Sequence, residues 1–355
     1  MKILICFFLI LYSASVIAAP SEQLEVNVNP GIELFTIIQL LAGKYPAPTP
    51  SLYSQEVMSY FSQYKNHPAV VKVVNFKKVY TDLPELGCCF SNFPEISIYE
   101  PITISWYTLY GKTNILEYMR LCREFSRDSH FWQFYNLHQK RYKQWGLTLK
   151  VKIDSQQLVQ KLQGFYKYNV GVQWNICIDP LNSWGAHTIL MSELNPEFSK
   201  CLVHTTGYFN PDGDIDKDPV FEYRNFAYLA WHEGSHFYTD SLQKKYAAQI
   251  NSLSYLFANS DAEGMKRAEI KTWAHCFDET LVRAITCALY KKYRPENEYK
   301  KQLSGDIAQD FIYVEDLNLF ISEKYVNTKR YKNFASFFPD LLNYLKKKYP
   351  EQIRH

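Results

Sequence analysis

The chain has 355 residues, of which 47% are hydrophobic and 21% charged, and its formal net charge is +3. This composition is ordinary for a globular protein with a substantial core, and the length suits one large domain or two smaller ones. The small charge argues against nucleic acid as a partner, and the 28 Tyr and 23 Phe are not interleaved with a basic run.

The N-terminus has the pattern of a signal peptide. Lys2 precedes an apolar run over residues 3–12, and residues 16–18 (VIA) place small or aliphatic side chains at the −3 and −1 positions of a cleavage site. We predict a signal peptide over 1–18, cleaved after Ala18, and therefore a secreted or periplasmic protein. The alternative is an uncleaved anchor, but the run is short for a bilayer span of about 20 residues. We expect no stable membrane insertion after cleavage.

The rest of the chain predicts an α+β fold. Residues 19–165 form a mainly helical N-terminal region, in which Pro20 to Pro50 are largely irregular. Apolar side chains recur at helical spacing over 32–43, 54–64, 114–125 and 130–145.

A second region, residues 166–355, begins with a small sheet and continues with helices. Alternating and β-branched runs predict strands at 170–178 and 201–209, and a short apolar run over 188–191 lies between them. A helix then starts a few residues after Pro219 and runs to about Leu242. Further helices are predicted over 265–292, 306–323 and 333–348, with a polar connector over 293–305.

The segment Trp231–His236 (WHEGSH) contains the pattern H-E-x-x-H inside a predicted helix. Histidines four residues apart lie on one helix face, so His232 and His236 can converge on one ion. Glu233 lies beside that ion, where it can deprotonate a water molecule. The alternatives are an ordinary surface pair or core histidines satisfied by hydrogen bonds. The spacing favours a catalytic zinc site with one Zn2+ ion.

A catalytic zinc ion needs a third protein ligand and one open position. Asp240 lies four residues after His236 on the same face, and Asp278 and Glu279 lie on the next long helix. Apolar residues form one stripe of that helix, and Glu279 projects to the opposite side, as a cleft wall requires. Periodicity alone does not choose between Asp278 and Glu279.

The combination of His232-Glu233-x-x-His236 with Glu279 in the stretch 278–284 (DETLVRA) resembles the glutamate-zincin metallopeptidases. The closest likeness is to an exported bacterial family of unknown function with predicted metallopeptidase character. That resemblance implies a zincin-like catalytic region with a small mixed sheet. It also implies His232, His236 and Glu279 as metal ligands and Glu233 as the catalytic residue.

Two further stretches extend the resemblance over most of the mature chain. Residues 179–185 (DPLNSWG) match a D-P-L-N-x-W-G segment of that family, and residues 131–135 (FWQFY) match its aromatic helix. The resemblance implies an exported zinc-dependent metallopeptidase that acts on a peptide or protein substrate. The alternatives are a zinc amide hydrolase acting on cell-wall peptides and a non-catalytic binding protein on a zincin scaffold.

Supporting residues remain open at this stage. A tetrahedral oxyanion needs a hydrogen-bond donor; the candidates are His187, His204, His275, Arg283 and Tyr290. Acceptors that orient the ligand imidazoles could be Asp240, Asp278 and Asn182. An extended substrate could pair with an edge strand over 182–191 or 201–209. Gly234 indicates either close approach of a neighbouring backbone or simple tolerance in a long helix.

A weaker signal is the acidic segment 210–218 (NPDGDIDKD), which could bind Ca2+ through alternate aspartates. Its glycine is misplaced for a calcium loop, and the twelfth position is Tyr223, so a solvated acidic turn is the alternative. Seven cysteines lie outside the predicted signal peptide. Their spacing fits no CxxC zinc site, and buried thiols are the default expectation.

Overall fold

The computed structural model describes residues 24–48, 50–77, 83–101, 104–171, 173–183, 185–196, 198, 200–206, 217–218, 226–257, 263–267 and 270–351. The predicted signal peptide, residues 1–18, lies outside these ranges. So does most of the acidic segment 210–218, of which Lys217 and Asp218 are described. The carboxylate of Asp218 lies 3.3 Å from the Arg141 guanidinium.

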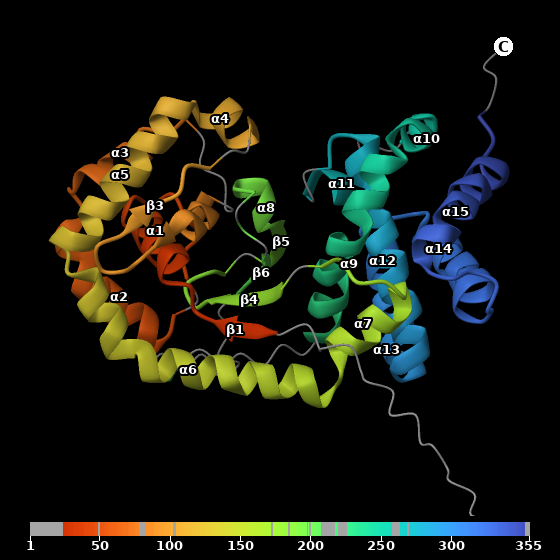
Figure 1. The fold of residues 1–355 in the computed structure, drawn as a ribbon, viewed down its shortest axis with the longest axis horizontal. Helices are drawn as coiled ribbons and strands as arrows, with labels where there is room; N and C mark the ends of the chain where they lie inside the picture. The colour runs from red at the N-terminus through yellow and green to blue at the C-terminus, as the bar shows by residue number, and fades with distance from the viewer. Residues whose placement is uncertain are drawn as a thin grey trace, which may run out of the picture.

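The protein is mostly helical with a small sheet, as the α+β prediction expects. The N-terminal helices are α1 (Pro30–Leu41), α2 (Leu52–Phe61), α3 (Pro68–Val74), α4 (Ile104–Tyr110), α5 (Lys112–Asp128) and α6 (Phe131–Ser155). Asn29 caps α1, because its side chain accepts from the amides of Gly31 and Ile32. Figure 1 shows α1 to α5 gathered on one side of the sheet, with the long α6 running beneath it.

Four strands form the main sheet in the order β1 (Glu25–Asn27), β4 (Gln173–Asp179), β6 (Lys200–Thr206), β5 (His187–Leu190). The first three are parallel, and β5 runs antiparallel to β6. β5 is thus an edge strand, whereas β6 is paired on both sides, so the alternative edge at 201–209 is wrong. The strand β1 was not predicted, since three residues between prolines carry no periodic pattern.

A short 3-10 helix, η2 (Leu83–Cys89), and the hairpin β2 (Phe90–Ser91) with β3 (Ser97–Ile98) complete the N-terminal side. On the other side of the sheet lie α7 (Leu158–Tyr166), α9 (Phe226–Lys245) and α12 (Trp273–Tyr293) (Figure 1). The remaining helices are α8 (Met191–Leu194), α10 (Ala247–Asn251), α11 (Glu263–Arg267), α13 (Glu296–Ile307), α14 (Val314–Ile321) and α15 (Phe334–Lys348).

Three predictions of helix boundaries are wrong. The helix predicted over 306–323 begins only at Val314, as α14. The predicted helix 265–292 is two helices, because α12 begins at Trp273, where the Thr272 side chain caps it by accepting from the amide of His275. The predicted connector 293–305 is helical: Pro295 ends α12 but also caps the start of α13. The buried residues of α13 are Tyr299 and Asp306, too few to give an apolar stripe in the sequence.

Gly234 lets α9 pack closely on the sheet. A Cβ atom at this position would lie 2.4 Å from the Trp174 ring of β4 and 2.6 Å from the Leu162 side chain of α7. The close approach is therefore made by side chains, so neither the approach of a neighbouring backbone nor simple tolerance, the two alternatives for this glycine, describes it.

No helix in the described ranges combines the length and apolar character needed to cross a membrane. Six cysteines of the described residues are buried and unbridged: Cys88, Cys89, Cys122, Cys177, Cys276 and Cys287.

Candidate metal centre

The candidate site lies where α9 packs against α12 and against the edge strand β5. One face of α9 carries Tyr228, His232 and His236 at successive four-residue intervals. Glu279 and Arg283, also four residues apart, lie on the facing side of α12. These five side chains form a polar seam between the two helices.

The two histidines of the motif and Glu279 converge. Their ligand atoms all lie within 4.8 Å of one another, and the group could hold a metal ion. His232 Nε2 lies 3.6 Å from one Glu279 oxygen, and His236 Nε2 lies 3.6 Å from the other. His232 is almost completely buried. These are the three residues that the sequence resemblance implied as ligands.

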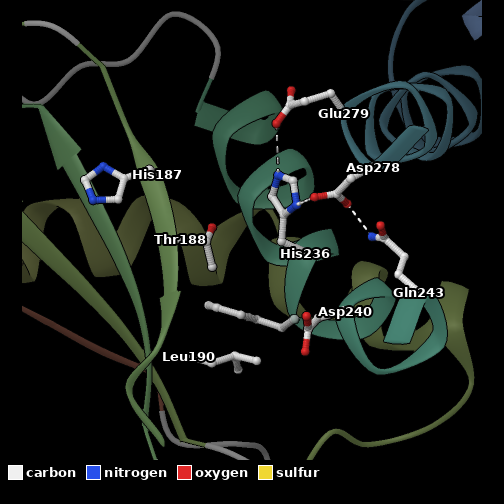
Figure 2. A pocket seen from close by; sticks show the side chains of 9 residues that line it. His187, Thr188, Leu190, His236, Asp240, Gln243, Asp278 and Glu279 are labelled. Carbon is white, nitrogen blue, oxygen red and sulfur yellow. Dashed lines mark hydrogen bonds and ion pairs between the residues drawn. The ribbon is translucent and has the colours of Figure 1, made fainter. Parts of the chain in front are cut away.

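Asp278 orients His236. Its carboxylate lies 3.2 Å from His236 Nδ1, and Gln243 donates to its other oxygen (Figure 2). A proton on Nδ1 leaves Nε2 free to coordinate. Asn182 donates to the Gly185 carbonyl and Asp240 pairs with Lys244. Of the three predicted orienting acceptors, Asp278 is therefore the one whose contact with a ligand imidazole the structure shows.

The electrostatics of the two imidazoles differ. Burial lowers the pKa of His236, but the charge and hydrogen bond of Asp278, together with Glu279 and Glu233, raise it to about 10. Burial, with Arg283 and His236 nearby, lowers the pKa of His232 well below its usual range. Without a metal ion the site therefore holds a proton on His236, which a cation would have to displace.

Glu233 lies on the adjacent face of α9, beside the β5 edge. It is buried, and the Thr188 hydroxyl lies 2.8 Å from its Oε2 and 2.9 Å from its backbone carbonyl. Burial raises the pKa of Glu233 to about 7, and the hydrogen bond from Thr188 and the charge on His236 oppose this rise. A carboxyl group with such a pKa can take up and release a proton near neutral pH.

A cavity of about 320 Å³ opens between β5 and the two helices. Its lining comes from β5, α9 and α12, and comprises His187, Thr188, Leu190, His236, Phe237, Asp240, Gln243, Asp278 and Glu279 (Figure 2). One wall therefore contains two of the candidate ligands, His236 and Glu279, and the opposite wall is the edge strand.

The structure separates the predicted oxyanion donors. His187 is adjacent to Thr188 on β5, and its ring points to the other side of the strand from His236, where it pairs with the buried Glu85 (Figure 2). His275 is exposed, and the His204 side chain lies outside the described residues. Tyr290, buried against Trp231, is about three turns, or roughly 16 Å, beyond Glu279 on α12.

Arg283 is the remaining predicted donor, and it lies in the seam. Its Nη2 is 3.4 Å from Glu279 Oε2, and its Nη1 donates to Asp306 at 2.7 Å and to the Tyr228 hydroxyl at 3.1 Å. Tyr228, which the sequence analysis did not single out, stacks on His232 with ring centroids 5.0 Å apart. The spacing of four residues before His232 was a signal that could have identified it.

Fold and site together define an α+β protein with a partly buried His-His-Glu group that could hold a metal ion. The chain belongs to the family described as Domain of unknown function (DUF4932), whose model matches residues 107–344, more than half of the sequence. The match includes both seam helices and the whole main sheet except β1. No curated protein and no solved structure matches the chain.

Proposed function

We propose that the protein is an exported zinc-dependent metallopeptidase. The observation that carries this proposal is the convergence of His232, His236 and Glu279 beside the buried Glu233. Two imidazoles and one carboxylate, with a fourth position open, form a donor set used by catalytic zinc sites. The cavity along β5 gives a substrate access to that position.

The spacing of the donors supports zinc. Zn–N and Zn–O bonds of about 2.0–2.2 Å in a tetrahedron place neighbouring ligand atoms roughly 3.3 Å apart. The two imidazole–carboxylate separations are 3.6 Å, so a small movement of the side chains would bring all three into coordination. The Asp278–His236 hydrogen bond adds the outer carboxylate that zinc-binding histidines usually have.

A bound zinc ion would lower the pKa of a coordinated water to about 7 and polarise a carbonyl group. The chain itself supplies the proton transfers. Glu233 accepts the proton of the attacking water and delivers it to the leaving amine, a role its pKa of about 7 suits. Thr188 holds the Glu233 side chain towards the cavity wall by a hydrogen bond.

The edge strand supports a peptide as the substrate class. Among the described residues β5 is paired with β6 alone, so its other backbone edge lies at the sheet border. An extended peptide could add to such an edge through main-chain hydrogen bonds, with its scissile bond directed towards Glu233. A zinc amide hydrolase acting on cell-wall peptides would use the same residues. A non-catalytic binding protein would have no need of the buried Glu233.

The test is metal analysis and peptide cleavage by the full chain lacking residues 1–18. We expect about one zinc ion per chain and cleavage of a mixed peptide library. Glu233→Gln should retain zinc but lower kcat by about 10³-fold, because the proton acceptor is lost. The exposed Glu315→Gln is the matched control and should behave as wild type. A protein that binds zinc but cleaves no peptide would contradict the proposal.

Two substrate sets separate the peptidase from the cell-wall alternative. One contains ordinary L-peptides, and the other contains cross-linked stem peptides with D-residues. We expect faster cleavage of the L-peptides, since pairing with β5 requires a regular extended backbone. Cleavage confined to the stem peptides would favour the amide hydrolase.

A further inference from the structure

Two residues of the α9–α12 seam, Tyr228 and Arg283, are not among the candidate metal ligands. Tyr228 lies one turn before His232, and the two rings stack at an interplanar angle of 22°. Arg283 lies one turn after Glu279 on the facing helix. The four side chains therefore form two adjacent contacts between the helices. His232 faces Glu279 in one contact, and Arg283 donates to the Tyr228 hydroxyl in the other.

The Arg283 guanidinium is fixed from several directions. Asp306 of α13 accepts from Nη1 at 2.7 Å, Glu279 lies 3.4 Å from Nη2, and the group stacks over the Phe311 ring at 4.1 Å. The Arg283 side chain is only 11% exposed. A guanidinium held in this way is a rigid donor. One of its terminal nitrogens faces the candidate ligand Glu279, and the other donates to the Tyr228 hydroxyl.

The Tyr228 hydroxyl has a proton to donate. Its oxygen accepts from Arg283, and within the described part of the chain no residue accepts the phenol proton. The Tyr228 ring stacks on His232, and the Arg283 guanidinium that donates to its hydroxyl lies 3.4 Å from Glu279. Two contacts therefore join the phenol to two of the candidate ligands.

We infer that Tyr228 is a catalytic residue, the hydrogen-bond donor to the oxyanion that forms during peptide hydrolysis, and that Arg283 is the positioning residue that aims it. This inference rests on the proposed function. Water forms the new C–O bond, and the carbonyl electron pair moves to oxygen, where the Tyr228 O–H stabilises it. When the C–N bond breaks, that pair re-forms the carbonyl, the amine leaves with the proton from Glu233, and Tyr228 keeps its own proton.

The other predicted donors are less suited to this role. His187 points to the opposite face of β5, and His275 is exposed. Arg283 itself is held by Asp306 and Glu279, so it cannot turn towards a substrate without breaking both pairs. The phenol has a donor that no described residue uses, which an oxyanion requires.

Tyr228→Phe is the direct test, because it removes one hydroxyl and keeps the ring that stacks on His232. We expect zinc affinity and KM to stay within about twofold and kcat to fall by about 10²- to 10³-fold, the usual effect of losing one oxyanion donor. Tyr168→Phe is the matched control. The Tyr168 hydroxyl donates at 2.6 Å to the backbone carbonyl of Tyr238, which lies on α9 as Tyr228 does, but away from the ligands. It should leave kcat unchanged.

Arg283 is tested by zinc affinity, which does not require turnover. Arg283→Gln should weaken zinc binding by about 10- to 100-fold, since Glu279 loses its partner, and should also lower kcat. Arg283→Lys keeps the charge and should restore part of the zinc affinity and part of kcat.

An active wild-type protein with an equally active Tyr228→Phe variant overturns this inference alone. A wild-type protein that binds zinc and cuts no peptide overturns it together with the proposed function. Reduced zinc affinity in Tyr228→Phe would make Tyr228 a structural residue and also overturn the inference.

Discussion

Buried carboxylates occur in two regions of the molecule, with different surroundings. On the N-terminal side, Glu33 of α1 accepts a hydrogen bond from the Tyr53 hydroxyl, and Asp179 at the end of β4 accepts from Thr36 and Tyr45. In the α9–α12 seam, Asp278 and Glu279 face two imidazoles and a guanidinium, and they border a cavity.

The surroundings decide what each carboxylate can do. Burial and the nearby charge of Asp179 raise the pKa of Glu33 well above its usual range, and the hydrogen bond from Tyr53 opposes this rise only in part. Burial therefore favours the neutral form of Glu33, which accepts a hydrogen bond inside the packed N-terminal region. Although burial raises the pKa of Asp278, the charge and hydrogen bond of His236 lower it below its usual value. A carboxylate that stays charged beside imidazoles and a cavity can help to bind a cation.

The largest effect should come from removing the carboxylate ligand. Glu279→Ala should weaken zinc binding by more than the roughly 10- to 100-fold typical of an outer-shell change, because only two imidazoles remain. Zinc content and a chelator competition measure this effect. Asp240→Asn is the control, since Asp240 lines the same cavity but pairs with Lys244. Unchanged zinc binding in Glu279→Ala would pass the ligand role to Asp240 or Asp278.

Removing the carboxylate that orients His236 should have the next largest effect. Asp278→Asn keeps the shape of the side chain but removes the charge that holds the Nδ1 proton. We expect zinc affinity to fall by about 10- to 100-fold. Gln243→Leu should have a weaker effect in the same direction, because Gln243 contacts Asp278 and not the imidazole. If Asp278→Asn binds zinc as tightly as wild type, His236 is oriented by packing alone.

Zinc binding should depend on pH. The pKa of His236 is raised to about 10 in the metal-free site, so its imidazole is protonated at neutral pH and zinc must displace that proton. Affinity should therefore rise with pH, by up to about tenfold per unit below the pKa of His236. Calorimetry in two buffers with different ionisation enthalpies should show release of about one proton. An affinity that is constant between about pH 6.5 and 8 would contradict this account.

The α+β class and the helix with the motif follow from local periodicity, which is why they could be predicted. The strand β1 and the break before α12 could not, because both depend on non-local pairing and on a cap. For the site, helical spacing placed His232 and His236 together, but only the resemblance favoured Glu279 over Asp278. The structure gives both acids a role, one facing Nε2 and one facing Nδ1 of the same imidazole.

The proposed donor to the oxyanion was missed in the sequence for a different reason. Histidine, arginine and tyrosine side chains were considered because of their chemistry, but their direction depends on strand alternation and on partners far along the chain. His187 points to Glu85, about a hundred positions earlier, and Arg283 pairs with Asp306 of a helix that was predicted as a connector. The buried pairing of Glu33 with Tyr53 gave no sequence signal at all.

The smallest effect should come from Glu33→Gln, and it tests the neutral state of this acid. Between the unfolded pKa of about 4.3 and the raised folded pKa, the folded protein keeps a proton that the unfolded chain loses. The free energy of unfolding should therefore fall as pH rises in this window, by up to about 1.4 kcal/mol per unit, and Glu33→Gln should remove that contribution. Urea unfolding of the metal-free chain at about pH 5, 6 and 7 measures the difference. Zinc affinity should not change, because Glu33 contacts no candidate ligand.

A Glu33→Gln variant with the same pH dependence as wild type would show that Glu33 is charged in the folded protein. The contrast between the two regions would then rest on geometry alone.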